Sequence, residues 1–525
     1  MDKSKCVRIL DGSEKMVFQS GEGFEVDSLP AGTRVIYPPP PLPGIGDIDG
    51  AIEQALDNPL GCEPLSALFQ PGMKVTIVFD DLSLPLPQMQ TPDLRQRIIT
   101  KVLEKLAAAS ITDIHLIAAL GLHRRMTPAE LKRVLGKQIF NAFYPNQLYN
   151  YDAEDQDNNV YLGQTEKGED VEINRRVAES NLVIYVNINL VSMDGGNKSF
   201  ATGVSTYRTI RCHHNHHTLM HSRSYMDPSK SALHSSCDRM GKIIENQVKI
   251  FKIETTVNND CSPHWLTFLR KPAWEFNQFD WLNFYANKLS TDLLPPSIKR
   301  EVFNRIFAPY GLTGIHAGRT DLVHEKTLEN VFKQQLIPVQ GQADILIAGL
   351  PFLGPYNVNS IMNPILVVCN SLGYLFNFYR GQPLVRKGGV CIFLYPLHED
   401  FHPIHHPSYI EFYQRVLTDT TDPKIIEQKY EAEFAHNPKY IDLYRNSYAY
   451  HGVHPFYMWY WASYGRSYVG KVIFVKPRSK RPAEIMGFDT AESIAEALEM
   501  AKDVVGANPS ITNYHAPPFS ICDVT

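Results

Sequence analysis

The chain has 525 residues, 44% of them hydrophobic and 20% charged, which is the composition of an ordinary globular protein. Its length predicts several domains, at roughly 150 residues each. The formal net charge of −5 excludes a basic surface for nucleic acid. The sequence contains no run of about 18 apolar residues, so it predicts no membrane span. The eight cysteines are scattered without a Cys-x-x-Cys pair, which favours a reduced, cytoplasmic protein without a disulfide framework.

Apolar runs and helix-capping signals predict an α/β fold from residue 74 onward. Val75–Phe79 is a continuous apolar run, typical of a buried parallel strand. A helix is expected to begin at Thr91-Pro92 and to end near Ala109. Further strands are predicted over 114–120 and 182–189, with a capping box at Thr127-Pro128-Ala129-Glu130 between them. Strands that alternate with helices predict a parallel sheet with right-handed crossovers.

The second half of the chain restarts this pattern. Residues 246–335 are rich in aromatic side chains and show less regular periodicity. Strands are then predicted over 343–349, 389–394 and 471–475. Asp489 is expected to cap a helix that carries Glu492 at its third position and ends near Val505. The sequence therefore predicts two α/β domains with mainly parallel sheets.

Three segments that follow strands of the first domain carry polar side chains: Asp80–Pro85, Gly121–Thr127 and Gly195–His214. In open parallel sheets, ligands bind outside the carboxyl ends of the strands. These three loops are therefore expected to converge on one ligand site.

Each candidate residue has a functional and a purely structural interpretation. Asp81 is suited to a sugar hydroxyl of a nucleotide-like cofactor, or to an Asx turn. His123 is a candidate general base, or a surface histidine before a helix. Lys198 is a candidate for a covalent or phosphate contact, or a solvated loop lysine. Gly195-Gly196 allow close approach of the backbone to a ligand, and His214 is a candidate metal ligand.

Two histidine clusters add a metal hypothesis. Residues 213–217 contain four histidines, which are either exposed or partly metal-bound. A second cluster, His398, His402, His405 and His406, is a metal site, a lid, or an exposed polar loop. The sequence lacks Gly-x-Gly-x-x-Gly after a strand, a Walker loop and a Gly-x-Ser-x-Gly elbow, which removes the usual support for dehydrogenase, phosphate-hydrolase and serine-hydrolase functions.

The segments Leu120–Thr127 and Gly195-Gly196-Asn197-Lys198 resemble the nickel-pincer lactate racemase family. The likeness is good over residues 34–255 and weak but colinear to the C-terminus. It implies two α/β domains with the active site in the cleft between them. The expected division is an N-terminal extension (1–33), a lactate racemase-like N-terminal domain with the cofactor loops (34–260) and a C-terminal α/β domain that closes the cleft (261–525).

The resemblance also implies a cofactor and a reaction. The family's nickel-pincer pyridinium mononucleotide is tethered to a lysine that corresponds to Lys198, and its nickel is completed by a histidine that corresponds to His214. By position, His123 is an acid–base residue, and Asp81 with Gly195 and Gly196 binds the cofactor. The implied chemistry is racemisation or epimerisation: a base removes the hydroxyl proton, hydride moves to the pincer, and the ketone receives hydride on its other face. A small-molecule substrate and separate cofactor-maturation enzymes are the implied partners.

Two positions depart from the family pattern. The substrate-binding arginine falls at Leu84, and the second acid–base histidine falls at Ile188. We therefore expect a different, larger 2-hydroxy acid or a sugar acid, with a second base from His216, His217 or the 398–406 segment. Two alternatives are a catalytically altered member that binds a small acid or nucleotide, and a hydrolase or lyase with a conventional metal at residues 398–406.

Overall fold

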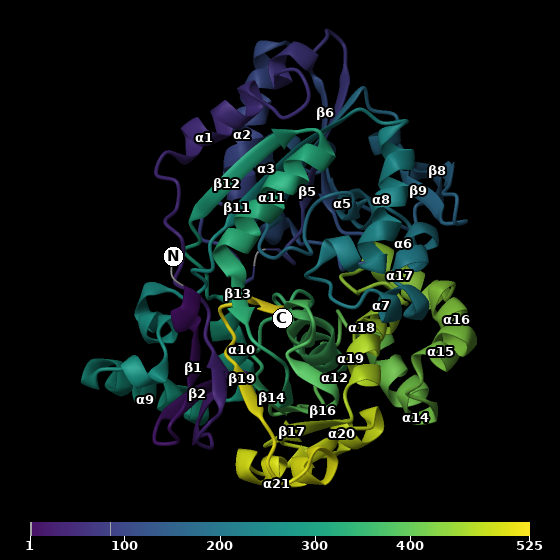
Figure 1. The fold of residues 1–525 in the computed structure, drawn as a ribbon. Helices are drawn as coiled ribbons and strands as arrows, with labels where there is room; N and C mark the ends of the chain where they lie inside the picture. Colours follow the sequence, from purple (N-terminus) through teal and green to yellow (C-terminus); the bar gives the residue numbers. More distant parts are fainter. Residues whose placement is uncertain (1–2, 85) are drawn as a thin grey trace.

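The computed structural model describes residues 3–84 and 86–525 (Figure 1). The chain is a mixed α/β protein with two mainly parallel sheets, as the sequence predicts. Figure 1 shows the first sheet, with β5, β6, β11 and β12, in its upper part and the second, with β14, β16 and β17, in its lower part.

The first sheet has six strands in the order β12-β11-β10-β5-β6-β7. Neighbouring strands are parallel except β11 and β12. The predicted strands at 75–79, 114–120 and 182–189 are confirmed within one residue at each end. Buried apolar side chains on these strands each contribute about 1.5–3 kcal/mol to folding. The strands are β5 (Lys74–Asp80), β6 (Asp113–Ala119), β7 (Leu148–Asn150), β10 (Leu182–Asn189), β11 (Ile250–Val257) and β12 (Leu312–Gly318).

Helix α3 (Pro128–Phe143) begins with the predicted capping box, in which Thr127 and Glu130 each bond the other's backbone N–H. Helix α2 (Leu94–Ala108) begins later than predicted. Asp93, rather than Thr91, is its N-cap, because the Asp93 carboxylate accepts the N–H of Arg95. The other helices up to residue 245 are α1 (Ile48–Asp57), α4 (Arg175–Ala178), α5 (Lys198–Gly203), α6 (Tyr207–His213), α7 (His216–His221) and α8 (Ala232–Glu245).

The second sheet has seven strands in the order β1-β4-β19-β14-β16-β17-β18. All neighbours are parallel except β1 and β4. The predicted strands at 343–349 and 471–475 are confirmed, and the one at 389–394 is the last part of a longer strand that begins at Val385. The strands are β1 (Val7–Ile9), β4 (Arg34–Ile36), β14 (Ala343–Gly349), β16 (Val385–Leu394), β17 (Lys471–Val475), β18 (Asp489–Ala491) and β19 (Ile511–Tyr514).

The predicted helix cap at Asp489 is wrong. Asp489 begins β18, which pairs with β17. Helix α21 (Ile494–Val505) starts four residues further on, where the Ser493 hydroxyl accepts the N–H of Glu496. Ser493 rather than Asp489 is the N-cap of the helix, because residues 489–491 form backbone hydrogen bonds with β17 as an edge strand.

Residues 246–335 are more regular than their sequence indicates. They contain β11, α9 (Gln278–Leu293), α10 (Pro296–Asn304), β12 and α11 (Thr320–Gln335). Strand β11 was not predicted from the sequence, because Lys252 and Glu254 interrupt its run of apolar residues. Both side chains are nevertheless buried.

The two sheets draw strands from both sides of the predicted domain boundaries. Strand β4 pairs with β19 of the second sheet, and β12 pairs with β11 of the first. Helix α11 packs against β11 and β12. The chain therefore crosses between the sheets several times, and the division at residues 33 and 260 stays a prediction.

The remaining elements cover the sheets and line the space between them. Helix α18 (His454–Trp461) is buried along its whole length, as expected for an internal helix. The other strands are β2 (Lys15–Ser20), β3 (Gly23–Ser28), β8 (Asn159–Gln164), β9 (Asp170–Asn174), β13 (Leu336–Val339), β15 (Tyr379–Gly381) and β20 (Ile521–Val524). The other helices are α12 (Pro364–Val368), α13 (Pro407–Glu411), α14 (Leu417–Asp419), α15 (Pro423–Ile426), α16 (Ala432–Ala435), α17 (Pro438–Asn446), α19 (Ser463–Tyr468) and α20 (Arg481–Met486). Among the described residues, no helix has both the length and the apolar character needed to cross a bilayer.

Candidate active site

The three polar loops meet at a cavity of about 490 Å³ at the carboxyl ends of β5, β6 and β10. We call it the loop cavity. Its lining includes Asp81, His123, Gly195 and Lys198, so the predicted convergence of the three loops is confirmed. Gly196 and His214 are not part of this lining.

Asp81 and His123 form the central polar pair of the loop cavity. His123 Nδ1 lies 2.8 Å from Asp81 Oδ2, and Ser83 donates its N–H (2.8 Å) and hydroxyl to Asp81 Oδ1. Burial raises the pKa of Asp81, but the charge and hydrogen bond of His123 and the Ser83 bonds lower it below its usual value. An ionised Asp81 holds the proton of His123 on Nδ1, which leaves the Nε2 lone pair free to accept a proton.

Asp80 is the buried neighbour of this pair at the end of β5. Its oxygens accept hydrogen bonds from the Asn187 amide (2.6 Å) and the Ile188 N–H (2.7 Å) of β10. Burial raises the pKa of Asp80 to about 7. The hydrogen bond from Ile188 and the charge of Lys252 lower this pKa, but their effect is smaller than that of burial. Asn187 in turn accepts the Ser199 hydroxyl at 3.1 Å, so Asp80 connects β5 to the start of α5.

Lys198 is the first residue of α5, and its side chain reaches the loop cavity. Its ammonium group donates to the Met193 carbonyl at 3.0 Å. The lysine is therefore held by the turn that precedes it, and it forms part of the cavity lining.

The glycine pair before Lys198 is explained by the protein's own packing. Gly195 has φ +85°, and an added Cβ would lie 2.3 Å from Asn189 Oδ1 and 2.7 Å from Glu254 Oε1. Gly196 has φ +58°, and its added Cβ would lie 2.9 Å from the ring of His324. Glycine is thus required at both positions without reference to a ligand.

A buried charge cluster that the sequence did not indicate supports this turn. Glu254 and Lys252 of β11 are fully buried, with Glu254 Oε1 and Lys252 Nζ 3.6 Å apart. Glu254 accepts the N–H of Gly196 at 2.7 Å and lies 3.1 Å from His324 Nδ1, while Lys252 donates to the Gly196 carbonyl at 3.1 Å. Burial raises the pKa of Glu254, but His324 and Lys252 lower it to about 2. The alternation of Phe251-Lys252-Ile253-Glu254 is the signal that would have identified this strand.

His214 is the C-cap that follows α6, and it is buried beside His213. His213 Nε2 lies 2.9 Å from the Ala201 carbonyl, which accepts only, so the proton of His213 is on Nε2. Its Nδ1 therefore accepts the Nδ1–H of His214 at 2.7 Å, and His214 carries its lone pair on Nε2. Burial, followed by the neighbouring His213, lowers the pKa of His214 well below its usual value. The ring packs 5.6 Å from Tyr457 and 5.3 Å from Trp461 of the second half of the chain.

The second half of the chain also closes over His123. The ring of His123 lies 5.3 Å from Tyr356, 6.4 Å from Tyr450 and 5.4 Å from His454. His454 Nδ1 bonds the Tyr409 hydroxyl at 2.6 Å, whereas its buried Nε2 has no hydrogen-bond partner. A buried nitrogen without a partner is costly, so His454 is a functional candidate, and it was not selected from the sequence.

The two departures from the family pattern have clear structural consequences. Ile188 is fully buried in β10, and its N–H is bonded to Asp80. Leu84 lines the loop cavity and also a second, apolar cavity next to it. Neither His216, bonded to Ser463 at 3.2 Å, nor the exposed His217 is among the described rings that pack against His123.

The histidines of residues 398–406 are bonded within the protein. His398 Nε2 lies 3.5 Å from Glu22, His405 Nδ1 lies 2.9 Å from the Ser360 hydroxyl, and His406 Nδ1 lies 3.3 Å from the Asn363 amide. These three side chains are buried, so the interpretation of an exposed polar loop is wrong. In the part of the chain that the structure describes, no group of three or more His, Cys, Asp or Glu side chains is placed to hold a metal ion.

The fold and the cavity define an α/β protein whose candidate ligand site lies at the carboxyl edge of a parallel sheet. Residues 26–227 match the model of the lactate racemase N-terminal domain. The chain is 29% identical over 169 residues to a lactate racemase of Lactiplantibacillus plantarum, and 24% identical over 167 residues to one of Thermoanaerobacterium thermosaccharolyticum. These alignments cover 31% of this chain and 37% of each relative.

The fold comparison extends over the whole chain. The lactate racemase apoprotein of Thermoanaerobacterium thermosaccharolyticum superposes with a TM-score of 0.63, 16% identity, and coverage of 98% of this chain and 100% of that one. The chain therefore shares the fold of that apoprotein over almost its whole length, and its sequence likeness to lactate racemases lies in the N-terminal part.

Proposed function

We propose that this protein is a racemase or epimerase of a 2-hydroxy acid and uses the nickel-pincer nucleotide cofactor of its family. The observation that carries the proposal is the meeting of Asp81, His123 and Lys198 at one cavity. Three separate loops supply these side chains, and each has a distinct role in such a reaction.

The residues present fit the cofactor. His214 directs an unprotonated Nε2 lone pair away from His213, which is the form of histidine that binds a metal. Lys198 lies at the cavity edge, near enough for its charge to lower the pKa of His214. Lys198 would hold the cofactor covalently and His214 would bind its nickel. When bound, the cofactor supplies reversible hydride transfer at the carbinol carbon. Its delivery would require maturation enzymes as partners.

The chain's own residues supply the proton transfer. Asp81 fixes His123 in the tautomer whose Nε2 accepts the substrate hydroxyl proton, and it stabilises the imidazolium that forms. His454, with its unpartnered Nε2 beside His123, would serve as the second proton-transfer residue in place of the histidine lost at Ile188. The cofactor would supply the hydride chemistry that inverts the carbon, and His123 and His454 would hold and return the hydroxyl proton.

The first experiment measures intact mass and metal content on protein purified from its native source. We expect a mass increment that maps to Lys198, together with near-stoichiometric nickel. Lys198→Ala should remove the increment and the activity, whereas Lys230→Ala, which alters an exposed lysine, should change neither. An unmodified Lys198 without nickel, in a host that makes the cofactor, would favour the alternative of a binding protein for a small acid or nucleotide.

A second experiment tests the proton-transfer residues in cofactor-loaded protein. His123→Ala should retain the cofactor and lower turnover by about two to four orders of magnitude, as for a lost general base. His454→Phe should lower kcat with little change in KM and should alter one limb of the pH profile. A pH profile and turnover equal to those of the unaltered protein would remove His454 from the mechanism.

A further inference from the structure

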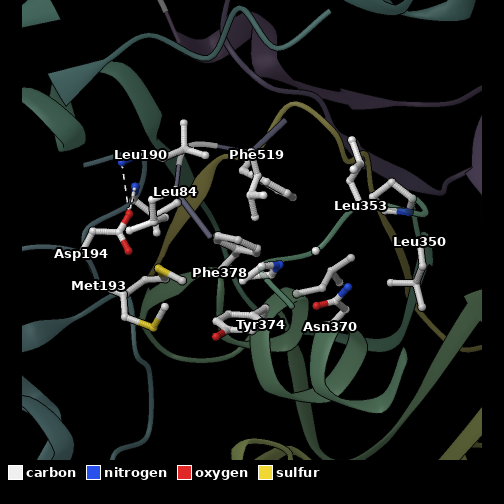
Figure 2. A pocket seen from close by; sticks show the side chains of 17 residues that line it. Leu84, Leu190, Met193, Asp194, Leu350, Leu353, Asn370, Tyr374, Phe378 and Phe519 are labelled. Carbon is white, nitrogen blue, oxygen red and sulfur yellow. Dashed lines mark hydrogen bonds between the residues drawn. The ribbon is translucent and has the colours of Figure 1, made fainter. Parts of the chain in front are cut away.

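A second cavity, which we call the apolar cavity, lies next to the loop cavity, and residues from both halves of the chain line it. It spans about 620 Å³ of empty space, the open solvent at its mouth included, and it shares Leu84 and Asp194 with the loop cavity. Figure 2 shows side chains from both halves of the chain around it, with Leu84 and Met193 opposite Leu350 and Leu353. An occupant whose reacting carbon lies beside His123 would therefore extend past Leu84 into this space.

The lining of the apolar cavity contains few polar groups, and none of them is positively charged. Among the described residues that line it, there is no lysine, arginine or histidine. Asp194 is 3% exposed, and its Oδ2 accepts the N–H groups of Leu190 and Val191, each at 3.1 Å. The Tyr374 hydroxyl is bonded to that of Tyr356 at 2.7 Å. A carboxylate placed here would meet Asp194 and no counter-charge, which is strongly unfavourable in a buried site.

The buried arginines closest to the loops do not compensate for the leucine at position 84. Arg95 is bonded to Asp93 at 2.8 Å, and Arg124 is bonded to Glu130 at 2.8 Å. Both guanidinium groups also donate to backbone carbonyls. They are thus committed to holding the loops together.

We propose that the apolar cavity binds the side chain of the substrate, and that this substrate is a 2-hydroxy acid with a long alkyl or aryl substituent. This inference rests on the proposed function, because it takes His123 as the position of the reacting carbon. It excludes sugar acids, whose hydroxyl groups would lose their hydrogen bonds to water in this lining. Leu84 then favours long substituents over lactate, because the methyl group of lactate buries little apolar surface against it.

The experiment measures binding to the full-length protein by calorimetry with a series of 2-hydroxy acids: lactate, 2-hydroxybutanoate, 2-hydroxyhexanoate and 2-hydroxyoctanoate. Burial of each methylene contributes about 0.8 kcal/mol, so Kd should fall about fourfold per added methylene. Five methylenes separate lactate from 2-hydroxyoctanoate, so we expect 2-hydroxyoctanoate to bind about 1000-fold more tightly than lactate when all five are buried. Equal affinities across the series would overturn the inference.

A matched pair of variants locates the binding. Leu84→Arg should weaken 2-hydroxyoctanoate at least about tenfold, because it places a charge between the two cavities. Leu293→Arg makes the same change at a 75% exposed position and should leave the series unchanged. Equal effects of the two variants would overturn the assignment to the apolar cavity. The chain-length series in the unaltered protein stands even where a variant fails to fold.

The readout separates this inference from the proposed function. Calorimetry requires no turnover, so tight, length-dependent binding together with an unmodified Lys198 would support the apolar cavity and contradict the racemase. A nickel-loaded protein whose affinity for 2-hydroxy acids does not depend on chain length would support the racemase and contradict the assignment of the apolar cavity.

Discussion

Replacing Gly195 by alanine tests whether the glycine pair before Lys198 is imposed by the protein's own packing. The added Cβ would lie 2.3 Å from Asn189 Oδ1 and 2.7 Å from Glu254 Oε1. Glu254 has little freedom to move, because Lys252, His324 and the Gly196 N–H all hold its carboxylate. The substitution therefore forces a buried, paired charge out of position.

The expected loss of stability has two parts. Alanine in a left-handed conformation costs about 1 kcal/mol relative to glycine. Disturbing one partner of a buried ion pair costs about 3–5 kcal/mol. Gly72→Ala is the matched control, since Gly72 has φ +78° and no atom lies within 4 Å of its added Cβ. We expect Gly195→Ala to lower the free energy of unfolding by about 4 kcal/mol or more, and Gly72→Ala by about 1 kcal/mol.

The assay is urea unfolding of the two variants and the unaltered chain, with the slope m compared alongside the midpoint. Hydrogen exchange over residues 187–203 adds a local measurement, because loss of the Glu254 bonds should speed exchange in this turn first. Equal midpoints for the two variants would refute the reasoning, since they share the backbone cost and differ only in the contacts of the added methyl group.

Two further predictions concern stability. Burial lowers the pKa values of His213 and His515 to about 4, whereas the unfolded chain titrates near 6.5, so the unfolded state binds protons first on acidification. The free energy of unfolding should therefore fall between pH 6.5 and 4, by up to about 1.4 kcal/mol per pH unit for each such histidine. Asp80 and Glu431, with pKa values raised to about 7, act in the opposite direction but are outnumbered, since His234 and His405 are lowered to about 3 and 2. Urea midpoints at pH 7.5 and 5 check this, and a higher midpoint at pH 5 would contradict it. Arg124→Met should cost about 3–5 kcal/mol, because it leaves the Glu130 carboxylate buried without its partner. Arg305→Met, at an exposed pair with Glu301, should cost less than about 1 kcal/mol, and thermal unfolding of both variants compares them.

The local parts of this protein were predictable because their signals are local. The apolar runs of β5, β6 and β10 and the capping box of α3 depend on neighbours within a few residues. The convergence of Asp81, His123 and Lys198 was also predictable, since parallel strands place their following loops at one edge. The roles of these residues, and the cofactor, remain proposals that the sequence resemblance supports.

The errors arose where one local signal competed with another or with a distant partner. Asp489 is a good helix cap by itself, but pairing with β17 made it the start of a strand. Lys252 and Glu254 were not selected from the sequence, because only the folded chain brings His324 and the turn at Gly196 to their charges. The glycine pair indicated a ligand, whereas the atoms that demand glycine belong to Glu254, Asn189 and His324.

The sequence by itself determined the α/β class, three strands of each sheet (β5, β6 and β10; β14, β16 and β17) and the three loops that carry the candidate site, because hydrophobic periodicity and capping act over a few residues. Only the tertiary structure decided that His454, more than 300 residues from His123 in the chain, packs against its ring. It also decided that Leu84 opens onto an apolar cavity whose other wall comes from residues 350–378. Contacts between segments so far apart depend on how the two sheets pack together, and no short-range pattern encodes that packing.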